Sequence, residues 1–332
     1  MERYNRNLYF DYLRGIAIIM VVGIHTFGRY GGFDGLHMVI NTLIRQVLNL
    51  GVPLFFAISG YFLSSKDLSS WDKIMSFWKK QILKVYIPAL LWGIPWLLYG
   101  VRSGSAPIEQ VVLWLCCGVS VLYYIAVTIQ CYLLLPMIKK ITPPQLRITT
   151  TVIISIASIV LVTWLRSFNG INMPLILYAG FFPLWIAFYA LGVTLRESER
   201  KYDIKWLIFL SLLALLLQLF ESHYLDRIGG VGFGIKPSSF LFSYVVILLL
   251  FSKKAEGAYK ASSIVNRIIT WIGELSFGIY LTHYLLIRFV IEWLSLKYTW
   301  ITDWLLTLCF SILIVIVMKK ILPERYHKYI GV

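Results

Sequence analysis

The sequence predicts an all-α membrane protein, a polytopic bundle of about ten transmembrane helices. Hydrophobic residues make up 59% of the 332 residues and the mean hydropathy is +0.75, whereas soluble domains are about 45–50% apolar. Apolar runs that approach the roughly 20 residues needed to span a bilayer recur about every 30 residues. The connections between them are too short for a soluble domain, so we expect residues 1–332 to form a single integral-membrane domain.

The chain is strongly basic, with a net charge of +15 and a pI near 9.6. Its basic residues lie in short groups between apolar runs, so we attribute them to membrane topology and expect no nucleic-acid partner. A ten-span arrangement places about three quarters of the 31 Lys and Arg on the side of the N-terminus. Both termini are therefore predicted to be cytoplasmic.

Apolar runs and breakers set the expected boundaries of the spans. Gly51 and Pro53 are expected to bend the second span, and Pro88 and Pro95 to kink or break the third. The pattern WDKIMSFWKKQILK predicts a separate surface helix before the third span. Another helix, lying at the surface, is expected near 108–117. The expected spans are 9–27, 43–63, 85–99, 119–138, 148–165, 174–195, 206–220, 240–251, 268–294 and 301–318.

The four cysteines lie in or beside apolar stretches, without a CxxC pair or a histidine at ligand spacing. They are interpreted as packing residues, and no metal site is predicted. These are Cys116, Cys117, Cys131 and Cys309.

The first span, DYLRGIAIIMVVGIHT at residues 11–26, carries two ionisable side chains. Arg14 and His25 are eleven positions apart, so they share one helix face about 16 Å apart along the axis. Ionisable residues inside a span are costly and predict a functional site. The simpler interpretation is that Arg14 reaches the inner interface paired with Asp11, while the ring of an interfacial His25 reaches the outer headgroups and does no chemistry.

Three motifs stand out along the chain. The first is Asp11 followed by Arg14-Gly15, with His25 ten residues after Gly15. The second is FFAISGY at 55–61, and the third is SFGIYLTH at 276–283. In their order and spacing these motifs resemble the acyltransferase 3 family, whose members transfer acyl groups to hydroxyls of surface glycans.

This resemblance implies a function, a location and a set of partners. The donor would be acyl-CoA, with acetyl-CoA expected, approached from the cytoplasm as a co-substrate, and no bound cofactor. The acceptor would be a hydroxyl on a lipid-linked or surface glycan such as the O-antigen of lipopolysaccharide. Membrane lipids would surround the protein in the bacterial cytoplasmic (inner) membrane. The chain would be a stand-alone form, without an appended extracellular domain.

The same resemblance assigns catalytic roles on the first span. Arg14 would orient the donor, supported by Asp11. His25 would act as general base on the acceptor hydroxyl, because a neutral imidazole accepts a proton near pH 7. A covalent acyl-imidazole is the alternative role for His25, and the sequence does not separate the two.

Three further residues are proposed as supporting ones. Ser59 is either part of the site or, with Gly60, a small residue that lets helices approach closely. His283 is either structural or on the acceptor side. Glu274 lies nine positions before His283, which places the two on opposite helix faces.

Lys79, Lys80 and Lys84 are candidates for binding the donor phosphates. Many family members carry arginines in this segment, whereas lysine binds phosphate as a point charge without the bidentate fork. Positive-inside topology explains these lysines equally well.

A second function remains open from the sequence. The same family architecture occurs in the membrane portion attached to serine racemases, and buried polar groups also line transport paths. The alternative is therefore a transporter of a small molecule such as an amino acid, or a glycan exporter.

Overall fold

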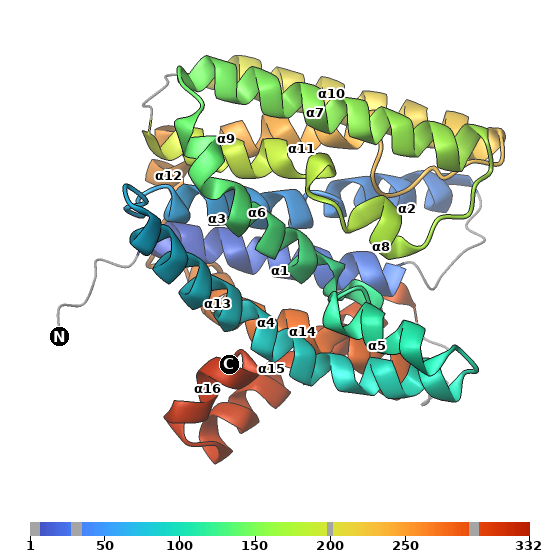
Figure 1. Ribbon diagram of the computed structural model, residues 1–332. Helices are drawn as coiled ribbons and strands as arrows, with labels where there is room; N and C mark the ends of the chain where they lie inside the picture. The colour runs from blue at the N-terminus through green and yellow to red at the C-terminus, as the bar shows by residue number, and fades with distance from the viewer. Residues whose placement is uncertain (1–6, 28–34, 198–201, 292–298) are drawn as a thin grey trace.

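The computed structural model describes residues 7–27, 35–197, 202–291 and 299–332. Within these ranges all regular secondary structure is helical, which confirms the predicted all-α class, and most of the long helices run side by side (Figure 1). The longer elements are α1 (Leu8–Phe27), α2 (Gly35–Leu48), α3 (Gly51–Leu63), α4 (Trp71–Arg102), α5 (Pro107–Leu115), α6 (Tyr123–Lys140), α7 (Pro144–Thr163), α9 (Ile186–Glu197), α10 (Ile204–Arg227), α11 (Pro237–Leu250), α13 (Ile264–Glu274), α14 (Ser276–Leu286) and α15 (Trp300–Ile321). The shorter ones are η1 (Ser120–Leu122), η2 (Trp164–Phe168), α8 (Leu175–Ala179), η3 (Phe182–Leu184), α12 (Lys253–Ala258), η4 (Ile287–Ile291) and α16 (Glu324–Ile330).

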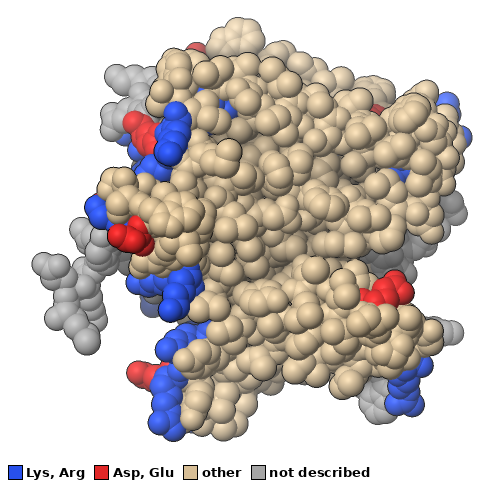
Figure 2. Space-filling view, viewed as in Figure 1, with Lys and Arg blue, Asp and Glu red and all other residues tan. Residues whose placement is uncertain are grey.

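The outer surface of the bundle is that of an integral membrane protein. Among the described residues, seven helical stretches are long and apolar enough to cross a membrane, and the apolar helices over Pro237–Leu250 and Ser276–Val290 are shorter. Leu212 and Phe220 of α10 are exposed, as lipid-facing residues would be. In Figure 2, charged side chains gather toward the two ends of the helices and leave a broad apolar band between them. The count of ten spans and the side of each terminus remain predictions.

Helix α1 lies in the middle of the bundle, in contact with α3, α13, α14 and α15. Its approach to α13 depends on two glycines. A Cβ atom on Gly15 would lie 2.0 Å from the carbonyl oxygen of Ile269, and one on Gly273 would lie 1.8 Å from that of Asp11. Any larger residue would force the two backbones apart.

Helices α3 and α9 make the same kind of contact. A Cβ atom on Gly60 would lie 2.1 Å from the carbonyl oxygen of Tyr189, and one on Gly192 would lie 1.9 Å from that of Ala57. The predicted close-packing role is therefore confirmed for Gly60.

Two expectations about breaks had opposite outcomes. The helix is interrupted at the place where a bend was expected at Gly51 and Pro53, because α2 ends at Leu48 and α3 begins at Gly51. The expected surface helix and third span are instead one continuous helix, α4, with Pro88 and Pro95 inside it. Neighbouring side chains can satisfy backbone groups that an internal proline frees.

The sixth expected span, 174–195, is wrong as a single helix. It is divided into α8, η3 and α9, with the breaks near Gly180 and Pro183. Gln130 of α6 satisfies the open backbone, because its side-chain amide donates to the carbonyl of Gly180 at 2.8 Å and accepts from the N–H of Phe182 at 2.9 Å. A broken helix inside a membrane requires such a partner.

The ninth expected span, 268–294, is also divided. Helix α13 ends at Glu274, a turn follows at Leu275, and α14 begins at Ser276. The chain then continues as η4, and residues 292–294 lie outside the described ranges.

Candidate active site

Arg14 is held by two contacts near the start of α1. Its Nη1 donates to Oδ1 of the buried Asp11 at 2.7 Å, so the pair predicted from the sequence is present. The guanidinium carbon lies 4.9 Å from the centre of the Phe62 ring. About a third of the Arg14 side chain stays accessible, at 35%. The ion pair therefore orients the guanidinium without covering it.

The accessible part of Arg14 borders a cavity of about 490 Å³, here called the Arg14 cavity. Lys66, just after the end of α3, and Lys84, within α4, are exposed and line its outer part, and His25 lines it deeper in the bundle. Ser59 lines it between these ends and therefore faces the cavity. Its aromatic lining includes Phe55, Phe62, Tyr123, Tyr124, Tyr132, Phe277 and Tyr280.

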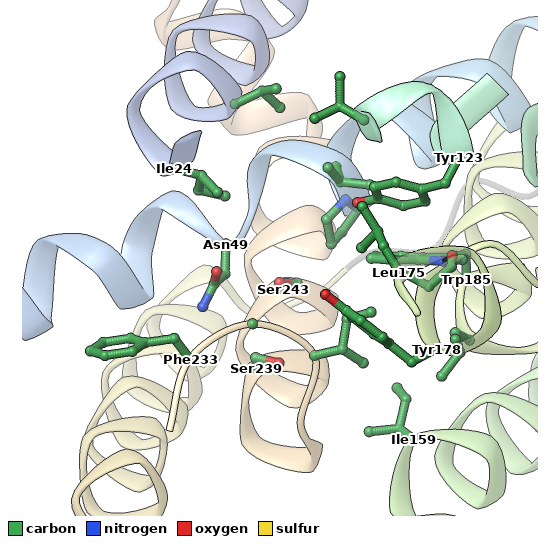
Figure 3. A pocket seen from close by; sticks show the side chains of 18 of the residues that line it. Ile24, Asn49, Tyr123, Ile159, Leu175, Tyr178, Trp185, Phe233, Ser239 and Ser243 are labelled. Atoms are coloured by element: carbon green, nitrogen blue, oxygen red, sulfur yellow. Dashed lines mark hydrogen bonds between the residues drawn. The ribbon is translucent and has the colours of Figure 1, made fainter. Parts of the chain in front are cut away.

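A second cavity, of about 450 Å³, lies toward the opposite end of the helices and is here called the Arg166 cavity (Figure 3). Its two cations are Arg45 from α2 and Arg166 from the turn η2 after α7. Figure 3 shows the hydroxyl end of Tyr178 turned toward Ser243 across this cavity. The other polar residues of its lining include Asn49, Ser120, Tyr123 and Ser239.

His25 lines both cavities, together with Val21, Val52, Val121 and Tyr123. The rest of this shared wall is apolar except for the Tyr123 hydroxyl. The imidazole therefore lies where a molecule in either cavity can reach it. Among the residues of the shared wall, His25 is the one able to act as a base near pH 7.

Two residues of α14 pack against His25. The ring centroids of His25 and His283 are 5.3 Å apart, and those of His25 and Tyr284 are 5.0 Å apart. Nδ1 of the fully buried His283 lies 2.7 Å from the carbonyl oxygen of Tyr280, so Nδ1 carries the proton and donates. Nε2 is then an acceptor, and the described part of the chain gives it no hydrogen-bond partner.

The structure separates the other predicted residues into two groups. Lys84 lines the Arg14 cavity, whereas Lys79 and Lys80 line neither large cavity. Glu274 is exposed and borders a shallow pocket beside Arg267, away from His25.

The described residues contain no group of three His, Cys, Asp or Glu side chains able to hold a metal ion. All four cysteines are free thiols, and two of them, Cys117 and Cys131, are buried as packing residues would be.

Sequence reasoning did not identify Arg45, Arg166 and Lys66 as site residues. Arg45 lies inside the expected second span, so the cost of an intramembrane charge is a signal that could have identified it. Arg166 follows the expected fifth span directly and resembles an ordinary loop residue.

Comparison with known proteins identifies the family. A model of the acyltransferase domain of the acyltransferase 3 family matches residues 7–319, nearly the whole chain. The chain belongs to the acyltransferase 3 family. It is therefore a membrane protein of an acyltransferase family, as the three motifs predicted.

Curated relatives of this acyltransferase 3 member match only in part. The chain is 34% identical over 85 residues to an amino-acid racemase of Enterococcus faecalis. That alignment covers 26% of this chain and 11% of the relative. It is 35% identical over 105 residues to a serine/alanine racemase of Enterococcus gallinarum. That alignment covers 30% of this chain and 14% of the relative. The chain thus spans a small part of either relative's length. No solved structure matches.

Proposed function

We propose that the protein transfers an acyl group, expected to be acetyl, from acyl-CoA across the membrane to a hydroxyl of a lipid-linked or surface glycan. The observation that carries this proposal is the position of His25 in the wall shared by the two cavities. Each cavity lies within the range of about 300–1,000 Å³ that is usual for small-molecule sites. One substrate could therefore approach the imidazole from each side.

The Arg14 cavity suits the donor. Lys66 and Lys84 supply positive charge at its outer part, where the phosphates of CoA would bind as point-charge partners. Arg14, oriented by Asp11, would donate to a phosphate or an amide oxygen of the pantetheine arm. The aromatic lining would exclude water from the arm, and the thioester would end at His25.

His25 would act as general base on the acceptor hydroxyl. The hydroxyl oxygen forms a bond to the thioester carbonyl carbon as the imidazole takes its proton. The carbon–sulfur bond then breaks, the electron pair leaves with the CoA sulfur, and the imidazolium returns the proton to that thiolate. The products are an O-acyl ester and free CoA. His283 would hold the His25 ring through their contact.

The acyl-imidazole route makes a different kinetic prediction. It would release CoA before the acceptor binds and would give ping-pong kinetics. Direct attack by the hydroxyl requires both substrates to be present. Burst release of CoA in the absence of acceptor would therefore assign His25 as the nucleophile.

Labelled membranes test the proposed reaction. Membranes from bacterial cells with and without this protein are incubated with acetyl-CoA labelled in the acetyl group. We expect protein-dependent label in a glycan fraction. Hydroxylamine should release this label, because it cleaves esters. If labelling does not depend on the protein, while vesicles containing it move an amino acid or a glycan without CoA, the protein is a transporter.

A further inference from the structure

The Arg166 cavity is positively charged. Arg45 and Arg166 line it, and the described residues of its lining include no Asp or Glu. Arginine in a membrane-spanning bundle is costly and usually pairs with another group or marks a pathway for a charged ligand.

Within the ranges that the structure describes, Arg166 has no acidic partner. Its guanidinium carbon lies 3.7 Å from the centre of the Tyr178 ring, which is the distance of close stacking. The described part of the chain gives its side chain no hydrogen bond or ion pair. Stacking covers the face of the guanidinium and leaves the N–H groups at its edge available, in the fork that matches a phosphate or carboxylate.

Arg45 is held beside His25. Its Nη1 donates to the carbonyl oxygen of Ile24 at 2.5 Å, and Ile24 directly precedes His25. The rings of Phe27 and Phe233 lie 5.7 Å and 5.8 Å from its guanidinium carbon. Among the described residues these partners are a carbonyl and two aromatic rings, none of which carries a negative charge to cancel that of Arg45.

The nearby acidic groups that the structure describes, Glu221 and Asp226, belong to a different cluster. Glu221 accepts hydrogen bonds from the backbone and hydroxyl of Ser238. The buried Lys236 donates to Oε1 of Gln46 at 2.6 Å. Burial lowers the pKa of Lys236 to about 8, against the opposing effect of Glu221 and Asp226. None of these charged residues lines the cavity, and the acidic groups already interact with the positive charge of Lys236.

Neutral hydrogen-bonding groups complete the lining. Asn49 lies between α2 and α3, Tyr178 belongs to α8, and Ser239 and Ser243 belong to α11 (Figure 3). They are suited to sugar or polyol hydroxyls. The cavity thus combines groups for hydroxyls with two cations for an anion.

We propose that the acceptor is anionic, with a phosphate or carboxylate that Arg166 and Arg45 bind while the acceptor's hydroxyl reaches His25. This inference rests on the proposed function and specifies its substrate class. The anion could be the phosphate that links a sugar to a lipid, or an acidic group within a glycan or polyol chain. A hydroxyl-bearing molecule without such a group would lack the partner that these arginines require.

The first experiment measures the charge of the product. Membranes are labelled with acetyl-CoA carrying a labelled acetyl group, and the protein-dependent ester is passed over an anion exchanger at neutral pH. We expect the label to be retained. Extraction into organic solvent would assign the anion to a lipid linkage, and retention in the aqueous polymer fraction would assign it to the glycan. Label in the unretained fraction overturns the inference, and absence of any label overturns the proposed function with it.

The second experiment tests the arginine itself. Mild base removes the acetyl group from the purified product and regenerates the acceptor, which is supplied at known concentrations to the protein in vesicles. Arg166→Gln should raise the KM for this acceptor roughly tenfold or more, with the KM for acetyl-CoA unchanged. Arg166→Lys should restore part of the affinity, because it keeps the charge. Arg102→Gln, at an exposed position of α4 outside both cavities, is the matched control. An unchanged acceptor KM in Arg166→Gln would overturn the inference.

Discussion

The two cavities are nearly equal in size, at about 490 and 450 Å³, and share a wall, but their charges are arranged differently. In the Arg14 cavity the deeper cation is paired with a buried carboxylate, and lysines line the outer part. In the Arg166 cavity both cations lack an acidic partner among the described residues. This difference is the basis for proposing that the Arg14 cavity binds the long donor and the Arg166 cavity an anionic acceptor.

The largest effect is expected at the wall that the cavities share. His25→Ala should lower kcat for acyl transfer by roughly 10²- to 10⁴-fold, the usual contribution of a general base. The amount of protein in the membrane should stay at the wild-type level. The control is His223→Ala, because that histidine is exposed on α10 and lines neither large cavity. Wild-type activity in His25→Ala would refute the site.

A smaller effect on kcat is expected at His283, which packs against His25. His283→Ala should lower kcat roughly 10- to 100-fold, because a ring that loses its neighbour no longer holds the attacking geometry. His283→Asn should retain more activity, since its amide can still donate to the carbonyl that Nδ1 contacts. Steady-state rates of the two variants check this, and equal losses would contradict the positioning role.

The donor side can be tested without disturbing the acceptor. In the double variant Asp11→Asn/Arg14→Gln a neutral hydrogen bond replaces the ion pair. We expect kcat/KM for acetyl-CoA to fall roughly tenfold or more, with the KM for the acceptor unchanged. A rise in the acceptor KM instead would show that the two cavities do not divide the substrates between them.

The smallest effect is expected at the outer part of the Arg14 cavity. Lys84→Gln should raise the KM for acetyl-CoA by about two- to fivefold, because an exposed charge pair contributes little. The increase should be smaller at high salt, which screens the charges. Lys79→Gln should have no effect, since Lys79 does not line the cavity. Equal effects of the two substitutions would favour positive-inside topology as the reason for both lysines.

The sequence predicted the helical class, an irregularity in the second span near Gly51 and the ion pair of Asp11 with Arg14, because these depend on hydrophobic runs and on residues close along the chain. It missed the breaks in 174–195 and 268–294. The first of these is stabilised by Gln130 of another helix, which no local pattern reveals. The contact between His25 and His283 could not be predicted either, because the two residues are far apart in the sequence.

The central claim is that the donor and the acceptor reach His25 from opposite sides of the membrane. It is tested most directly with sealed vesicles of the two orientations, given labelled acetyl-CoA that cannot cross the bilayer. We predict labelling in inverted vesicles, whose cytoplasmic face points outward, with the ester protected from added esterase until detergent opens them. Right-side-out vesicles should stay unlabelled. Equal labelling of both orientations, or an ester exposed on the same face as the CoA, would contradict the account.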